Sequence, residues 1–153
     1  MNRRSLPVGI AITAAAVLMV TACGASDDES SKAPSIKEIQ TTVSTEMHAA
    51  IKAATPKAVY PKDEFGSASS AECSGQQSSV RIAGWDPEET QSNGDLLTKS
   101  TAYLEKQGWE ITPLSADSED QAARITKSGV TEGLLTASNQ GLTFEGDTAC
   151  AKS

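Results

Sequence analysis

Apolar residues recur every three or four positions between residues 36 and 54, which is the spacing of one face of an α-helix. This face is made by Ile36, Ile39, Val43, Met47, Ala50 and Ala54, with Ile51 beside them. Ser35 and Glu38 form a capping-box pattern at the start, and Pro56 ends the helix because it forces Thr55 out of the helical region. The pattern predicts an amphipathic helix that starts directly after Ser35.

A second helix and several strands are predicted further along the chain. Residues 93–107 carry Leu97, Thr101 and Leu104 on one face, and Gly108 is suited to end the helix in a left-handed conformation. Alternation of apolar and polar residues predicts strands. These strands are residues 79–85, 109–113, 123–126, 130–137 and a last one that begins at residue 142.

The order of these elements favours an α+β fold, in which two helices pack on one face of a mainly antiparallel sheet of about five strands. Residues 35–153 would form this single domain. Residues 56–72 lack periodicity and carry two prolines and a glycine. We expect them to be an irregular connection that Tyr60 and Phe65 pin to the domain, or a loop with a binding role.

The N-terminus has the pattern of an export signal. Arg3 and Arg4 precede an apolar run over residues 6–20, which at 15 residues is shorter than the roughly 18 needed to span a bilayer. Residues 20–24, Val-Thr-Ala-Cys-Gly, resemble the lipobox of bacterial lipoproteins. The resemblance implies that residues 1–22 are removed and that Cys23 carries a diacylglyceryl group. An ordinary secretory signal is the alternative, and the arginine pair leaves twin-arginine export open.

Residues 23–34 are polar and include an acidic triplet, so we expect a flexible tether between the lipid and the domain. Because both arginines leave with the signal, the remaining 131 residues would carry 11 basic and 20 acidic side chains, a net charge of −9. That charge argues against nucleic acid as a partner. The many alanines, serines and threonines and the few aromatics suggest a high-GC bacterium such as an actinomycete.

The chain has three cysteines. With Cys23 lipidated, Cys73 and Cys150 remain as an even pair in an oxidising compartment, and we expect one disulfide between them. Two free thiols are the alternative. The disulfide would hold the strands next to the two cysteines close together, as neighbours in the sheet.

No pattern of catalytic residues is found. His48 is the only histidine, so a Ser-His-Asp triad or a two-histidine zinc site would depend on it, and the helical pattern places it on the solvent face without partners. The acidic residues 117–120 lack the ligand spacing of a calcium loop, which favours a solvated loop. We therefore expect no catalytic residues, no metal and no cofactor.

The large aromatic side chains are the remaining candidates for a ligand or partner surface. They are Tyr60, Phe65, Trp85 and Trp109. Core packing is the simpler role for the two tryptophans, and a tryptophan-lined groove between helices and sheet is the functional alternative.

The lipobox, the acidic tether, the helix after Ser35, Cys73 before a strand, Gly108-Trp109 and the final Cys150 together resemble small lipoproteins of actinobacteria, including the LppA-like group. The resemblance implies an extracytoplasmic, membrane-anchored α+β protein and brings no catalytic residues. Three functions stay open: a non-enzymatic module that binds another envelope protein, a carrier of a small molecule or lipid, and a hydrolase that uses Asp or Glu. The first is preferred.

Overall fold

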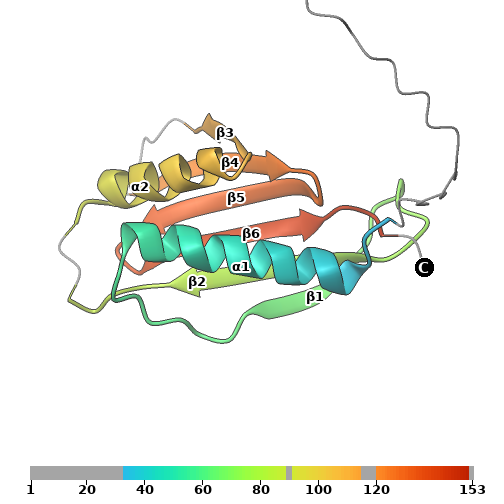
Figure 1. Cartoon of the computed structure of the whole chain (residues 1–153), viewed down its shortest axis with the longest axis horizontal. Coiled ribbons are helices and arrows are strands. Elements are labelled where there is room, and N and C mark those ends of the chain that lie inside the picture. Colours follow the sequence, from blue (N-terminus) through green and yellow to red (C-terminus); the bar gives the residue numbers. More distant parts are fainter. Residues whose placement is uncertain (1–32, 89–90, 115–119, 152–153) are drawn as a thin grey trace, which may run out of the picture. The chain divides into compact units, whose positions relative to one another are not determined.

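The computed structural model describes residues 33–88, 91–114 and 120–151, and it confirms the α+β class. Helices α1 (Ile36–Ala54) and α2 (Asn93–Lys106) lie over one face of an antiparallel six-stranded sheet (Figure 1). The strands are β1 (Glu64–Ala68), β2 (Gln77–Gly84), β3 (Glu110–Pro113), β4 (Gln121–Lys127), β5 (Val130–Ser138) and β6 (Gly141–Thr148). Their order across the sheet is β1-β2-β6-β5-β4-β3. The predicted signal, Cys23 and most of the tether lie outside the described residues.

Both helices begin and end where local sequence signals predict. The Ser35 hydroxyl accepts a hydrogen bond from the Glu38 backbone N–H at 3.3 Å, and the Glu38 carboxylate accepts one from the Ser35 N–H at 2.7 Å. Ser92 caps α2 in a similar way, through the Asp95 N–H at 3.2 Å. Gly108 follows α2 with a φ of 84°, a conformation that side chains disfavour.

The core lies between the helices and the sheet. Alternate residues of the central strands point toward α1 and α2 and are buried: Val80, Ile82, Ala123, Ile125, Leu135, Ala137, Leu142 and Phe144. The predicted face of α1 meets them, with Met47 and Ile51 fully buried. Phe144 occupies the space left by two glycines, because a Cβ on Gly133 or Gly146 would lie within 2.9 Å of its ring. The interior is therefore filled by side chains.

One strand of the sheet, β1, has no counterpart among the strands that the sequence pattern predicts. β1 lies within residues 56–72, which were expected to be irregular, and it brings the number of strands from about five to six. The reason is its place at the edge of the sheet, where its side chains are mostly exposed and need no apolar alternation. β1 pairs with β2 in an unbroken register from Glu64 opposite Arg81 to Ala68 opposite Gln77.

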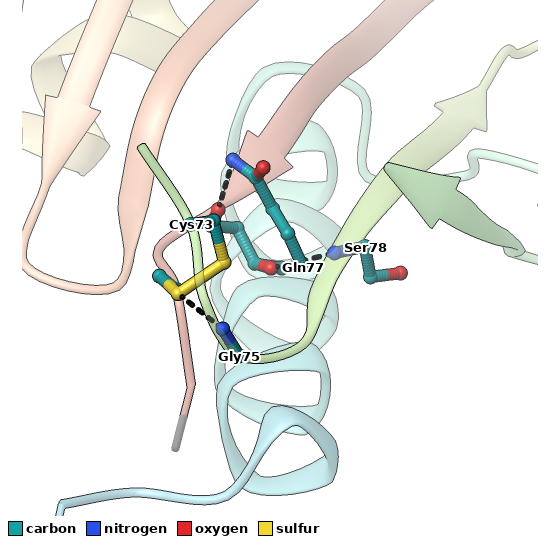
Figure 2. Close-up of a disulfide and its surroundings, with 6 residues drawn as sticks. Cys73, Gly75, Gln77 and Ser78 are labelled. Atoms are coloured by element: carbon teal, nitrogen blue, oxygen red, sulfur yellow. Dashed lines mark hydrogen bonds between the residues drawn. A yellow bond between two sulfur atoms is a disulfide. The ribbon is translucent and has the colours of Figure 1, made fainter. Parts of the chain in front are cut away.

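The predicted disulfide between Cys73 and Cys150 is present, with the two Cα atoms 5.4 Å apart. It joins the segment that enters β2 to the segment that leaves β6, and those strands are neighbours as expected. Figure 2 shows that Gly75 lies beside the bridge, where its N–H donates to a cysteine sulfur at 3.4 Å. Gly75 has no room for a side chain, since a Cβ would lie 2.0 Å from the Ala151 carbonyl oxygen.

Candidate functional site

Trp109, one of the four aromatic residues considered for a partner surface, has the simpler role expected for the tryptophans and belongs to the core. Its side chain is 4% exposed and meets Phe144 edge-on at 6.3 Å between ring centroids. Its indole N–H donates to the Glu46 carboxylate at 2.7 Å, and Lys127 binds the same carboxylate at 2.6 Å. A surface role for Trp109 was therefore wrong, because this carboxylate satisfies the indole N–H and makes its burial favourable.

Tyr60 holds the connection after α1 against the helix, as expected. Its hydroxyl donates to the His48 carbonyl oxygen at 3.3 Å, and its ring lies 4.7 Å from the His48 ring. Burial raises the pKa of the Tyr60 phenol, since the charged form would lose its hydration. Tyr60 is half-buried and serves as a structural contact between the connection and α1.

His48 has partners, in contrast to the prediction of a free solvent-facing side chain. Its Nε2 lies 2.8 Å from one carboxylate oxygen of Asp63, and the Ser44 hydroxyl donates to the other. The sequence pattern does not predict this contact, because Asp63 lies in a connection whose path no periodicity indicates. Ser44 and His48 are one helical turn apart, so one carboxylate can bind both.

The residue types of a catalytic triad meet here in Ser44, His48 and Asp63, but their hydrogen bonds run in a different order. In a triad the histidine lies between the serine and the aspartate, so that it can take the proton of the serine hydroxyl. Here the aspartate lies between the other two, and the serine proton is directed at the carboxylate. The three residues therefore fasten the connection before β1 to α1 and do not activate a nucleophile.

Phe65 and Trp85 are both exposed but lie on opposite faces of the sheet. Phe65 is 44% exposed and pairs with Val80 on the helix side of β1. Trp85 is 39% exposed. It follows Gly84, where a Cβ would meet Ile51 of α1, so Trp85 points to the face that carries no helix. The four candidate aromatics thus do not form one surface, and Trp85 alone belongs to the helix-free face.

The helix-free face of the sheet carries a row of charged residues that the strand pairing aligns. Arg81 on β2 contacts Glu145 on β6 at 2.9 Å and Glu64 on β1 at 3.7 Å. Arg124 on β4 contacts Glu132 on β5 at 3.8 Å. Exposed ion pairs of this kind contribute about 0–1 kcal/mol each to stability. These ion pairs chiefly make the helix-free face polar and well solvated.

Two shallow hollows lie on this face. The larger, about 690 Å³, includes Leu134 among the carboxylates of Glu64, Glu132, Glu145 and Asp147. The second, about 420 Å³, lies between Trp85 and Arg81, and its other lining residues include Ala83 and Thr143. Leu134 is 38% exposed in the middle strands of the sheet, where most outward positions are polar.

The sequence pattern indicates part of the helix-free face, namely which charged residues point outward from the strands. Arg81, Arg124, Glu132 and Glu145 occupy outward positions of predicted strands, which the alternation of each strand indicates. The strand order is a property of the whole fold, so the alternation could not show that Arg81 lies beside Glu145.

Among the described residues, no group of three or more His, Cys, Asp or Glu side chains is arranged to hold a metal ion. In the same part of the chain, no helix has the length and apolar character needed to span a membrane. Most of the acidic segment 117–120 lies outside the described residues. No family model, curated protein or solved structure matches the chain at a significant level.

Proposed function

We propose that this chain is a bacterial envelope lipoprotein, anchored through Cys23 on the extracytoplasmic side of the cell membrane, and that its domain is a non-enzymatic module that binds another protein. The disulfide supports export, because disulfides form and persist in oxidising compartments outside the cytoplasm. The observation that carries the binding role is Trp85, exposed beside Arg81 on the helix-free face.

Trp85 and Arg81 have the chemistry of binding hot spots. Tryptophan and arginine are enriched among the residues whose loss weakens protein interfaces most. The small side chains of Ala83 and Thr143 between them leave a hollow into which a partner side chain fits. The surrounding ion pairs would form the polar rim that interfaces have around such a centre.

The carrier and hydrolase alternatives find less support in the geometry. A carrier needs space between helices and sheet, and side chains such as Met47, Ile82 and Phe144 fill that interface. A carboxylate hydrolase needs acids that are held away from bulk water. Glu64, Glu132 and Glu145 share a hollow, but their side chains are 59–72% exposed.

Trp85→Ala is expected to lower recovery of the partner by at least about ten-fold, since a central tryptophan typically contributes 2 kcal/mol or more to binding. The test introduces a photo-crosslinking amino acid at Thr143 of the lipidated protein in membranes of its own host. Crosslinked products are then quantified with and without the Trp85 substitution.

Phe65→Ala is the matched control, because it removes a similarly exposed aromatic residue from the opposite face. A crosslinker at Thr41, on the solvent side of α1, tests for nonspecific capture. The proposal fails if position 143 captures no defined protein, or if both alanine variants reduce capture equally.

Cys23→Ser is expected to abolish incorporation of labelled fatty acid and to stop cleavage before residue 23, because the thiol that accepts the lipid is gone. The protein would then be found at the size of the unprocessed chain, which keeps residues 1–22, in place of the mature form. Metabolic labelling with a clickable palmitate analogue measures the first effect, and mass spectrometry of the N-terminus measures the second. Persistent labelling of the serine variant would contradict the anchoring proposal.

A further inference from the structure

β1 is an exposed sheet edge without the usual protection. Edge strands are commonly blocked by proline, lysine or a bulge, which prevent pairing with another chain. β3 at the opposite edge is four residues long and ends at Pro113. β1 has none of these features over residues Glu64–Ala68, and no further strand of the described chain pairs with it. Figure 1 shows β1 at the margin of the sheet, beyond the area that α1 covers.

The backbone direction of β1 determines which groups are available at this edge. The Gly66 carbonyl oxygen accepts a hydrogen bond from the Ser78 hydroxyl of β2 at 2.8 Å, so it points inward. Backbone groups of successive strand residues point to opposite sides. Phe65 and Ser67 therefore direct their N–H and C=O groups outward, where another strand can bind them.

We infer that two copies of this domain associate by antiparallel pairing of their β1 strands, with Gly66 of each copy at the two-fold axis. This register pairs Phe65 with Ser67 of the second copy, so the outward backbone groups of both residues are satisfied. It joins the two sheets into one continuous sheet. The inference is independent of the proposed partner at Trp85, which lies at a different place on the sheet.

The side chains of β1 are self-complementary in this register. Glu64 faces the neutral Ala68 of the second copy, so no two carboxylates meet directly across the strand pair, and Arg81 lies 3.7 Å from the Glu64 carboxylate within each copy. The two Phe65 rings become diagonal neighbours on the helix side, a separation that aromatic side chains can bridge. Their contact would cover the side chain that is 44% exposed in the single copy.

The interface is short, so the association is weak and depends on concentration. For this reason it is best measured in the membrane, where copies of the lipidated full chain are held close together. Two differently tagged copies are produced in the native host, and one carries a photo-crosslinking phenylalanine analogue at position 65. The expected result is a crosslinked product that contains both tags.

Ala68→Glu and Ala68→Lys form a matched pair that tests the register. In the dimer, glutamate at position 68 would face Glu64 of the other copy and lysine would attract it. Opposite charges directly across a strand pair stabilise the pairing and like charges weaken it, and the two-fold axis doubles the effect. We expect about three- to ten-fold more crosslinked product with lysine than with glutamate. Equal yields from the two variants would overturn the register.

Ser67→Pro removes an outward N–H, a substitution that an edge strand tolerates within its own sheet. It should reduce the product several-fold, whereas Ser67→Ala should leave it unchanged. The inference is overturned if the protein with the crosslinker at position 65 and no other change gives no doubly tagged product. It is also overturned if position 65 captures a different protein. Trp85→Ala should leave the yield unchanged, which separates this result from the partner proposal.

Discussion

Replacing both Cys73 and Cys150 with serine is expected to lower the free energy of unfolding by about 4 kcal/mol. The bridge spans 77 residues of sequence, and a crosslink over a loop of that length removes much of the conformational entropy of the unfolded chain. Stabilities of small domains are typically about 5–15 kcal/mol, so a loss of this size removes roughly a quarter to four-fifths of the stability. Urea unfolding followed by tryptophan fluorescence measures the change, because Trp109 is buried in the folded state.

Reduction of the wild-type protein provides the control for this experiment. The reduced wild type and the double serine variant should unfold at similar urea concentrations, since both lack the crosslink. The native contacts around the bridge, such as the pairing of Gln76 with Ala151, are available to both forms. A loss below about 1 kcal/mol would mean that the unfolded chain is already restricted and that the entropic account is wrong.

Phe144→Ala is expected to lower the free energy of unfolding by about 3–5 kcal/mol, the range for removal of a fully buried aromatic ring. The ring is 0% exposed on β6, in the middle of the sheet. The backbones of Gly133 and Gly146 lie against it, and neither residue has a side chain that could move into the vacated space. The cavity would therefore persist, which places the expected loss toward the upper part of the range.

Leu134→Ala is the matched control for Phe144→Ala. Leu134 lies on the neighbouring strand β5 but points to the helix-free face, where it is partly exposed. Its truncation should change the urea midpoint only slightly, because it removes surface that water already contacts. Similar losses for the two variants would contradict the assignment of the core to the helix side of the sheet.

Local sequence signals predicted the elements whose causes lie within a few residues. The capping box at Ser35, the end of α1 before Pro56 and the left-handed Gly108 were all confirmed. The meander of β4, β5 and β6 was also predictable, because short turns join strands that alternate clearly. The disulfide followed from counting cysteines, and the structure confirmed that it joins neighbouring strands.

The candidate site was less predictable, because it depends on contacts between distant segments. His48 was expected to be free because its helix face is polar, yet Asp63 reaches it from the following connection. Trp109 and Trp85 are equally apolar in the sequence, but a partner for the indole N–H lies on α1 for Trp109 only. Trp109 is therefore buried and Trp85 exposed, a difference that the residue type alone does not predict.

Periodicity, caps and motifs are local properties of the sequence, and they predicted the two helices, the central strands and the disulfide between Cys73 and Cys150. The lipid anchor at Cys23 stays a prediction from a motif of the same local kind. Contacts between distant segments make β1 a strand and leave Trp85 exposed beside Arg81. Both features depend on the spatial order of the strands in the sheet. That order is set by packing of the whole domain, and the sequence of a single segment does not indicate it.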